Sequence, residues 1–328
     1  MQYSRLGSTG LQVSRICLGT MSFGNAEEWM VEIDKAKPIV KRALDLGVNF
    51  FDTANVYSNG RSEEIVGELL KDHWDDVVIA TKVRVNTGEG PNKEGLSRYH
   101  IMSQVKKSLK RLQTDRIDLY QIHQWDYSTP IEETLIALND LVRQRMVNYI
   151  GASNLFAWQF AKALYTSDLL HVARFVSMQN HYNLCYREEE REMIPFCRDQ
   201  RIALLNWSPL ASGFLTGRYK RGKRADSLRC RSDKYTNFGE RLFQPEDFDV
   251  VESVEKVAKE KGLTPSQIAL AWLLHKGVCA PIIGATKVDY LEEAVNSLDV
   301  KLSTDDMKRL EEKYKPHQMI GPLPIPET

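Results

Sequence analysis

Short apolar runs of strand length alternate with longer amphipathic stretches through nearly the whole chain, and this alternation constrains the fold more than any other feature. Helices placed between such strands make right-handed crossovers, which requires the strands to run parallel. Ahead of the first run, "LGSTGLQ" (6–12) predicts an N-terminal β-hairpin. The eight runs that we interpret as strands are residues 16–21, 49–54, 77–83, 117–123, 149–154, 175–182, 202–210 and 280–286.

Three of the intervening helices have recognisable ends. Residues 38–46 carry an apolar face made by Ile39, Val40, Ala43 and Leu44, and the helix is expected to stop at Gly47, a residue suited to a left-handed C′ position. Two further helices are predicted to begin with a capping box, in which an N-cap Thr precedes Pro at the first position and Glu or Gln at the third. These residues are Thr129, Pro130 and Glu132 in one helix and Thr264, Pro265 and Gln267 in the other.

Eight such units favour an α/β fold, a closed (β/α)8 TIM barrel with the N-terminal hairpin and an extra C-terminal helix, although the pattern alone also allows an open doubly wound sheet. The position of the polar residues favours the barrel, because catalytic groups of barrels come from the carboxyl ends of several strands. Here those ends carry Asp52, Lys82, His123, Ser153, Asn154, Gln179, Asn180, Trp207, Ser208 and Gly284.

The chain of 328 residues is long enough for two average domains or for one barrel, which commonly has about 250 residues plus insertions. Since no linker or composition shift divides it, we expect one barrel domain over residues 1–328. Its longest irregular segment, residues 211–248 after the seventh strand, is of a length that is usually functional or disordered.

Composition excludes several classes of protein. Lys plus Arg equals Asp plus Glu at 44 each, so the net charge gives no reason to expect a nucleic-acid or membrane partner. The five cysteines are odd in number and contain no C-x-x-C, which argues against a disulfide framework or a zinc ribbon and favours reduced thiols in a cytosol. Without an apolar targeting segment or membrane span, we expect a soluble, cytoplasmic protein.

Four proton-bearing residues stand at the ends of the second, third and fourth strands: Asp52, Tyr57, Lys82 and His123. Each alone has an ordinary structural explanation, as a turn cap, a lid on the core, a solvent-directed lysine or a satisfied core histidine. Together on one rim they suggest a catalytic group. A phenol titrates near pH 10, but a nearby ammonium favours its anion, and a buried aspartate keeps that ammonium charged.

This arrangement predicts addition to a carbonyl. Tyr57, with a pKa lowered by Lys82, would protonate the carbonyl oxygen as negative charge develops there, and His123 would donate a second hydrogen bond to it. Because no G-x-S-x-G nucleophile motif is present, the simplest group to add is a hydride from a bound cofactor.

The sequence resembles the aldo-keto reductases over almost its whole length. The resemblance rests on seven motifs in the family's order: "FDTANVYSNG", "IATKV", "LYQIHQWD", "GASN", "SMQNHYN", "WSPLASGFLTGR" and "APIIGATK". Within the superfamily it is most similar to the longer bacterial members of the YajO type, and it shares Trp-Ser-Pro-Leu with the potassium channel β-subunits.

The resemblance implies reduction of aldehydes and ketones with NADPH. It makes Tyr57 the general acid, Lys82 its pKa partner, Asp52 the counterion of the lysine, and His123 the residue that orients the carbonyl. One departure concerns the loop after the tyrosine: many relatives have glycine there, whereas this chain has Ser58 and Asn59.

The cofactor is expected in the loops after the seventh and eighth strands, where barrels favour phosphate sites, since no G-x-G-x-x-G fingerprint follows any strand. By resemblance, Trp207 stacks on the nicotinamide, and Ser153, Asn154 and Gln179 bind its carboxamide. The pyrophosphate is assigned to Ser208, Leu210, Ser212, Gly213 and Arg218, and the adenosine end with its 2′-phosphate to Gly284, Thr286, Lys287 and Glu293. The alternative is that Trp207 belongs to the core and "GATK" is an ordinary turn.

Residues 218–231 are crowded with Arg and Lys in a neutral protein. Such a run is usually a solvated face. Its position beyond the phosphate loop equally suggests a flap that closes over the cofactor and slows its release, with Arg229 as a phosphate contact.

The substrate is the least determined part of the prediction. Met21, Trp29, Asn55 and Trp125 are expected to face an aromatic, mostly neutral pocket suited to small aldehydes and to aromatic or sugar-derived carbonyls. Lys287 and the basic segment favour NADPH over NADH. Two alternatives remain: a metal-dependent barrel hydrolase, for which the seven histidines offer no H-x-H pair, and a cofactor-bound sensor or regulatory subunit in which turnover is incidental. No metal site and no oligomeric state are predicted.

Overall fold

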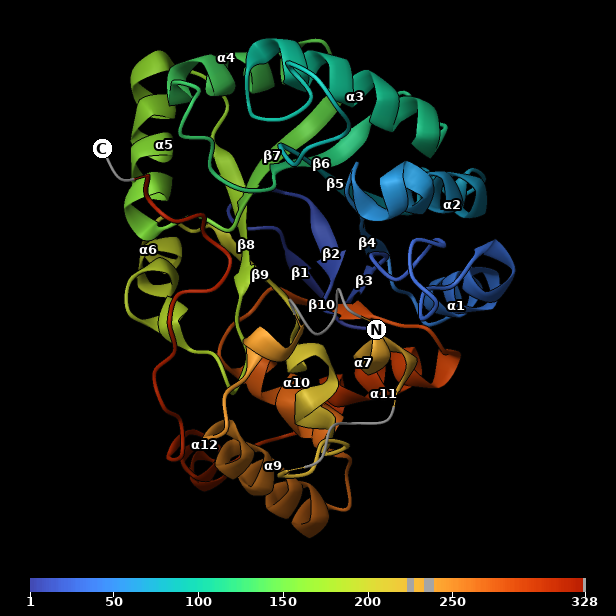
Figure 1. Ribbon diagram of the computed structural model, residues 1–328, viewed down its shortest axis with the longest axis vertical. Helices are drawn as coiled ribbons and strands as arrows, with labels where there is room; N and C mark the ends of the chain where they lie inside the picture. Colours follow the sequence, from blue (N-terminus) through green and yellow to red (C-terminus); the bar gives the residue numbers. More distant parts are fainter. Residues whose placement is uncertain (223–226, 233–238, 327–328) are drawn as a thin grey trace.

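The computed structural model of the chain describes residues 1–222, 227–232 and 239–326. Eight parallel strands close into a barrel in the order β10-β3-β4-β5-β6-β7-β8-β9, with helices around it (Figure 1). This confirms the predicted (β/α)8 barrel and the eight strand positions. The barrel strands are β3 Cys17–Gly19, β4 Phe50–Asp52, β5 Val78–Val83, β6 Ile117–Ile122, β7 Val147–Ser153, β8 Phe175–His181, β9 Ala203–Trp207 and β10 Ala280–Gly284.

The predicted N-terminal hairpin is also present, as β1 Tyr3–Arg5 paired antiparallel with β2 Gln12–Ser14. Its Leu6 and Val13 are fully buried in one apolar cluster with the inward side chains of the barrel, such as Phe50. The hairpin therefore closes one end of the barrel, and the opposite end remains for a site.

The period-two pattern of the strands explains why charged residues enter this barrel. In β5, Val78 and Ala80 belong to the inner cluster, while Ile79 and Val83 pack outward against the helices. Successive strand residues point to opposite faces, so Lys82 shares the inward direction of Val78 and Ala80. The same parity places Asp52 after Phe50 and Gln121 after Leu119 on the inside.

Helices surround the barrel and α12, the predicted extra C-terminal helix, packs on α9 (Figure 1). Short 3-10 helices lie at Tyr57–Gly60, Glu188–Glu190, Ala211–Thr216, Gly239–Leu242 and Ser297–Asp299. The α-helices are α1 Ile33–Asp45, α2 Arg61–Leu70, α3 Arg98–Leu112, α4 Ile131–Arg143, α5 Ala157–Leu170, α6 Met193–Asp199, α7 Leu228–Arg231, α9 Asp247–Lys261, α10 Pro265–His275, α11 Val288–Asn296 and α12 Thr304–Glu311.

The predicted helix ends are confirmed in two cases and wrong in one. Gly47 has a positive φ of 79° directly after the C-cap of α1, and Thr264 forms a capping box with Gln267 at the start of α10. Thr129 does not cap α4, because its hydroxyl donates to the Asp126 carboxylate at 2.7 Å and the helix begins one residue later. The helix predicted from residue 38 begins at Ile33, so it contains Pro38.

The long segment after β9 is less irregular than predicted. Its described parts contain two of the 3-10 helices and α7, and α9 begins at Asp247. Residues 223–226 and 233–238, which include part of the basic segment 218–231, lie outside the described residues.

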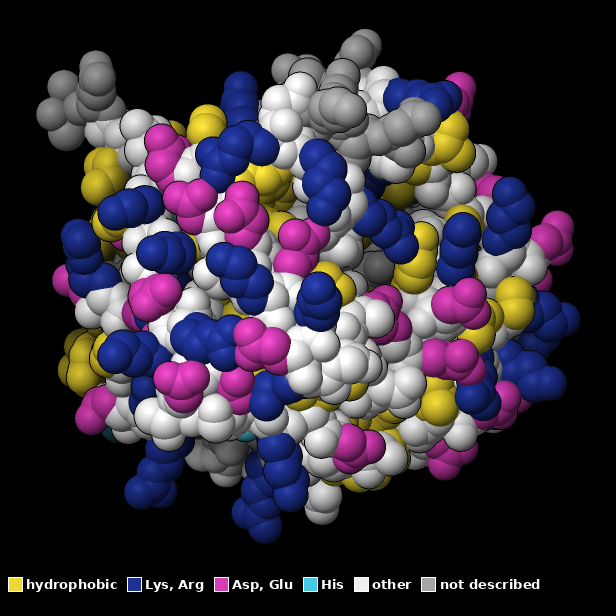
Figure 2. All heavy atoms as spheres, turned by 90° about the horizontal axis from the view of Figure 1, so that it is seen from below, with side chains coloured by type: hydrophobic (Ala, Val, Ile, Leu, Met, Phe, Trp, Pro, Cys, Tyr) yellow, Lys and Arg dark blue, Asp and Glu magenta, His cyan; other side chains and the backbone are white. Residues whose placement is uncertain are grey.

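Charges of both signs are interspersed on the face seen in Figure 2 rather than gathered by sign. All five cysteines are free, and four of them are buried. Among the described helices, none has the length and apolar character needed to cross a membrane.

Candidate active site

A cavity of about 960 Å³ opens at the carboxyl ends of the barrel strands. It contains residues from every predicted group: the proton-bearing residues, the phosphate loops and the substrate wall. The predicted residues that line it are Met21, Trp29, Asp52, Tyr57, His123, Asn154, Gln179, Trp207, Ser208, Leu210, Ser212, Gly213, Arg218, Arg229, Gly284, Thr286, Lys287 and Glu293.

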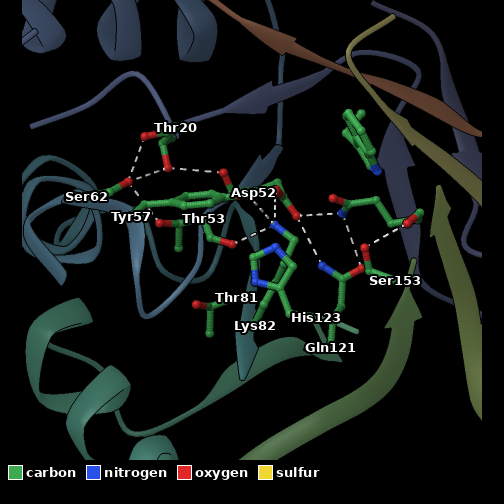
Figure 3. Close-up of polar contacts among 12 residues, drawn as sticks. Thr20, Asp52, Thr53, Tyr57, Ser62, Thr81, Lys82, Gln121, His123 and Ser153 are labelled. Carbon is green, nitrogen blue, oxygen red and sulfur yellow. Dashed lines mark hydrogen bonds and ion pairs between the residues drawn. The ribbon is translucent and has the colours of Figure 1, made fainter. Parts of the chain in front are cut away.

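Lys82 is fully buried at the floor of this cavity and holds two of the predicted partners together. Its Nζ donates to Asp52 Oδ1 at 2.5 Å, to the carbonyl of Thr53 at 2.8 Å and to the Tyr57 hydroxyl at 3.3 Å (Figure 3). Three acceptors match the three N–H groups of an ammonium. The lysine is therefore saturated, and it points one of its donors at the phenol.

The second carboxylate oxygen of Asp52 is equally well bonded. Gln121 donates a side-chain amide hydrogen to Oδ2 at 3.1 Å (Figure 3), and Gln179 does so at 2.9 Å. These donors and Lys82 satisfy a carboxylate that is only 2% exposed. Such a buried ion keeps its charge only when its oxygens are paired in this way.

The electrostatics of the pair differ in one respect from the sequence-based expectation. Burial opposes the charge of Lys82, but Asp52 and the phenol together raise the pKa of the lysine above its ordinary value, so it stays an ammonium. Burial also raises the pKa of Tyr57, and this outweighs the pull of Lys82, which acts in the lowering direction. The expected net lowering of the phenol pKa is therefore wrong, and Tyr57 holds its proton at neutral pH.

His123 lies next to Tyr57, with the two rings edge to face at a centroid distance of 6.0 Å. Burial and the nearby cations Lys82 and Arg84 lower the pKa of His123 to about 3. The imidazole is therefore neutral near pH 7, and it can donate one ring N–H without carrying a charge.

Tyr57 is presented by a tight turn between β4 and α2. Ser58 and Asn59 both have left-handed backbones, with φ of 47° and 55°. These are the two residues that separate Tyr57 from Gly60. Left-handed non-glycine residues cost about 1–2 kcal/mol each, and such strain concentrates at functional sites.

Buried hydroxyls anchor the strand end that carries Asp52. Ser62 Oγ lies 2.9 Å from the hydroxyls of both Thr20 and Thr53, and it donates to the Thr20 carbonyl at 2.7 Å (Figure 3). Thr53 in turn provides the carbonyl that accepts from Lys82. The start of α2 thereby fixes the backbone on which the ion pair stands.

Trp207 forms the opposite wall, where Nε1 donates to Asn154 Oδ1 at 2.9 Å. The Asn154 amide nitrogen reaches the His123 carbonyl at 3.1 Å and Ser153 Oγ at 2.9 Å, and Ser153 donates to the Gln179 carbonyl. Asn154 therefore connects the Trp207 wall to the strand that carries His123.

The loop after β9 turns sharply around one side of the cavity. Ser208, Ala211 and Ser212 have positive φ values of 50°, 46° and 55°, and the buried Ser212 hydroxyl has no partner among the described residues. A Cβ built on Gly213 would meet nothing within 4 Å. Both features suit a loop that approaches a polar ligand closely with its backbone and hydroxyl groups.

Cationic side chains gather at this end of the cavity around Tyr290. Arg218 donates to its hydroxyl at 3.0 Å and lies over its ring, and Lys287 Nζ stands 5.8 Å from the same ring. Glu293 accepts a hydrogen bond from Thr264, the N-cap residue of α10. Arg229 lies 4.6 Å over the ring of Trp29, so the basic segment reaches the first βα loop.

Comparison with known proteins agrees with this geometry: the model of the aldo/keto reductase family matches residues 15–315. The chain belongs to this family. It is therefore an oxidoreductase. The curated relatives of this aldo-keto reductase include the aldo-keto reductase dtxS3 of Metarhizium robertsii, which is 40% identical over 98% of this chain and 93% of its own length.

Two further relatives have names that refer to a substrate. A putative aryl-alcohol dehydrogenase of Saccharomyces cerevisiae, AAD16, is 40% identical over 96% of this chain and 97% of its own length. The versiconal hemiacetal acetate reductase of Aspergillus parasiticus is 39% identical over 96% and 98%. These relatives are fungal, so the finer resemblance to bacterial members of the YajO type stays a prediction.

Four predicted site residues of this aldo-keto reductase do not line the cavity. Lys82 and Ser153 are fully buried behind lining residues, where Lys82 bonds to Tyr57 and Ser153 to Asn154. Asn55 is buried, where its amide donates to Gln104 at 3.1 Å, and Trp125 packs against Trp158. The structure thus places Asn55 and Trp125 behind the wall rather than in the predicted substrate pocket.

Several lining residues of the reductase were not predicted, among them Val85, Gln124, Tyr290 and Gly321. Gln124 directly follows His123, and Tyr290 lies one helical turn after Lys287, so proximity in sequence could have suggested both. Nothing in the sequence near Gly321 could have suggested its position, because the C-terminal segment is brought to the cavity by contacts with residues far away in the chain. Among the described residues, no three His, Cys, Asp or Glu side chains gather as metal ligands.

Proposed function

We propose that this protein reduces small aldehydes and ketones to alcohols with NADPH. The observation that carries the proposal is the buried ammonium of Lys82, held between the Asp52 carboxylate and the Tyr57 hydroxyl at the cavity floor. Such a triad serves proton transfer to an oxygen that gains negative charge.

Tyr57 is the proposed proton donor. It is protonated at neutral pH because burial raises its pKa, so it enters the reaction as an acid. Its O–H bond breaks as the carbonyl oxygen gains charge, and the phenolate left behind faces the Lys82 ammonium at hydrogen-bond distance. Solvent then returns the proton to Tyr57. The neutral His123 adds a hydrogen bond to the same carbonyl oxygen and so orients it.

The residues opposite Tyr57 fit nicotinamide adenine dinucleotide phosphate. When bound in its reduced form, this cofactor supplies the hydride that adds to the carbonyl carbon. We assign Trp207, Asn154 and Gln179 to the nicotinamide end, with Ser153 behind Asn154. We assign the pyrophosphate to Ser208, Leu210, Ser212, Gly213 and Arg218, and the adenosine end to Gly284, Thr286, Lys287 and Glu293.

Two observations support that fit. The buried Ser212 hydroxyl has no partner in the described part of the chain, and the backbone at Gly213 is open. Arg218 and Lys287 bring positive charge to the same end, which favours the phosphate-bearing NADPH over NADH, with Arg229 as a further phosphate contact.

The substrate class follows from the uncharged part of the wall. Met21, Trp29 and Trp207 give it an apolar and aromatic surface, which suits planar aromatic carbonyls. The aryl-alcohol dehydrogenase among the relatives supports the same class. The free, mostly buried thiols support the proposed cytoplasmic location.

Tyr57→Phe tests the proposal, because it keeps the ring and removes only the proton. We expect kcat for aromatic aldehydes to fall by about a hundredfold to ten-thousandfold. The Kd for NADPH, followed by cofactor fluorescence, should stay within about twofold, since the phenol contacts substrate rather than cofactor. Unchanged turnover would reject the role of Tyr57, and a lost NADPH affinity would show a structural role instead.

A further inference from the structure

We propose that His181 and Tyr186 are positioning residues that hold Trp207 in place and tie it to the C-terminal segment 317–321. The inference rests on the proposed function, in which Trp207 forms the nicotinamide wall. Neither residue lines the cavity, and both are fully buried.

The three rings form one continuous stack, which we call the ring stack (Tyr186, His181 and Trp207). His181 and Trp207 are the last residues of β8 and β9 and face each other in register. Their rings are 4.3 Å apart and inclined by 13°, and the Tyr186 ring covers the far side of His181 at 4.5 Å and 18°. Trp207 is the member at the cavity, so the position of its indole depends on the two rings behind it.

Hydrogen bonds determine which nitrogen of the middle ring, His181, carries the proton. The Asn183 side-chain oxygen accepts from the backbone amides of Cys185 and Tyr186, so the other end of that side chain is its NH₂ group. This NH₂ group lies 3.0 Å from His181 Nε2, which must therefore be the acceptor, and the ring proton is on Nδ1. The Nδ1 atom is buried without a partner among the described residues.

The ring is thus oriented by a single hydrogen bond and by stacking. Burial, with a smaller contribution from His317, lowers the pKa of His181 to about 3, which keeps it neutral. A flat neutral ring between two aromatic rings fits this place better than a charged or aliphatic side chain.

The far end of the stack is attached to the C-terminal segment. The Tyr186 hydroxyl accepts from the Ile320 backbone amide at 3.0 Å and lies 3.6 Å from the Met319 sulfur. His317, which pairs with Asp247, packs edge to face on the Tyr186 ring. Figure 1 shows this part of the chain returning from α12 past α6 and β8 toward α5.

The same segment then reaches the cavity itself. Gln124 donates to the Gly321 carbonyl at 3.3 Å. Gly321 has a φ of 109°, and a Cβ there would stand 2.5 Å from Asn154 Oδ1 and 3.5 Å from the Trp207 ring. The C-terminal segment is therefore linked to Trp207 in two ways: through Tyr186 and His181 from behind, and by the close approach of Gly321 to Asn154, which accepts the indole hydrogen bond.

His181→Leu removes the middle ring and tests the claim. We expect the Kd for NADPH to rise about tenfold and kcat/KM to fall by about tenfold to a hundredfold, because a displacement of about 1 Å in a positioned group can cost that much. Phe175→Leu is the matched control: it is equally buried on β8, replaces an aromatic ring in the same way, and packs on Phe160 away from the cavity.

The control separates positioning from loss of stability. Phe175→Leu should keep the wild-type NADPH Kd and kcat/KM even though both variants unfold at lower denaturant concentration. Wild-type values for His181→Leu, or an equal change in the control, would overturn the proposal.

Tyr186→Phe gives a second test that needs neither cofactor nor turnover. It keeps the stack and removes the acceptor of the Ile320 amide. Because that amide loses its hydrogen bond, its hydrogen should exchange with deuterium at least about tenfold faster. Unchanged exchange would refute the link between the stack and the segment. If the wild type reduced no carbonyl, the proposed function would fail, while NADPH titration and exchange would still decide the role of the stack.

Discussion

The two sides of the cavity are held together by different forces. On the side of β4, β5 and β6, a buried ion pair and the hydrogen bond of Gln121, joined by one from Gln179 on β8, hold Tyr57 and Asp52 in place. On the side of β8 and β9, parallel rings and a backbone contact from the C-terminal segment hold Trp207. Charges tolerate little rearrangement once buried, whereas stacked rings can slide at small cost.

The difference also lies in how far the partners are separated in the chain. Lys82 and Asp52 are 30 residues apart and stand on neighbouring strands. Tyr186 and Ile320 are 134 apart, and Gln124 and Gly321 are 197 apart. The ion pair of the charged side is therefore assembled by adjacent βα units, although Gln179 reaches it from β8, whereas the link between the ring side and the C-terminal segment requires the whole barrel. Substitutions on each side should therefore have different effects.

Removal of Lys82 should have the largest effect, because it breaks the charged side. In Lys82→Met the Asp52 carboxylate stays buried without its counterion, and we expect a loss of about 3–5 kcal/mol in the free energy of unfolding together with loss of activity. Urea unfolding checks this. The double variant Asp52→Asn, Lys82→Met should recover part of the stability but none of the activity.

An exposed ion pair provides the control for that variant. Arg61 pairs with Glu32 at 3.0 Å at the surface, with side chains 32% and 40% exposed. We expect Arg61→Met to cost less than about 1 kcal/mol, because solvent screens such pairs. Equal losses for Lys82→Met and Arg61→Met would contradict the account of the buried pair.

The second prediction concerns Glu189, which supports the ring side. Its carboxylate accepts from Asn180 at 2.6 Å, and Asn180 accepts from the Asn154 backbone amide. Burial raises the pKa of Glu189 to about 8 from 4.5. The folded state thus binds a proton that the unfolded state has released, and this stabilisation is complete below about pH 4.5 and lost as the pH rises through 8.

Glu189→Gln imitates the protonated form and should not show this loss. Between about pH 6 and pH 8.5 we expect the free energy of unfolding of the wild type to fall by roughly 2 kcal/mol more than that of the variant. Denaturant unfolding at both pH values measures it. Parallel pH profiles for the two proteins would exclude a protonated Glu189 in the fold.

The smallest effect is expected for Met21 and Trp125. The sequence predicted that both face the substrate pocket. Met21 lines the cavity and Trp125 lies behind it. Met21→Ala should raise the KM for an aromatic aldehyde severalfold, because the lost apolar contact with the substrate weakens its binding by about 1 kcal/mol. Trp125→Phe should leave KM within about twofold. A larger shift from Trp125→Phe would place that residue at the substrate.

Much of the charged side could be predicted because it follows from strand parity. Once residues 50–52, 78–83 and 117–122 are strands, Asp52 and Lys82 must point inward at one rim. The errors arose where a competing hydrogen-bond partner overrode a local pattern. Thr129 has the sequence of an N-cap, but the Asp126 carboxylate takes its hydroxyl. Asn55 stands near the rim, but Gln104 draws its amide away from the cavity.

The amino-acid sequence by itself determined the barrel, its eight strands and the rim that carries Asp52, Tyr57, Lys82 and His123, because alternation and strand-end position are local properties. Only the tertiary structure decided that burial raises the pKa of Tyr57 by more than Lys82 lowers it. Only the tertiary structure, too, decided that Tyr186 and His181 stack behind Trp207 and that the C-terminal segment bonds to that stack. Desolvation and ring contacts depend on how closely distant segments pack, and no local pattern encodes that distance.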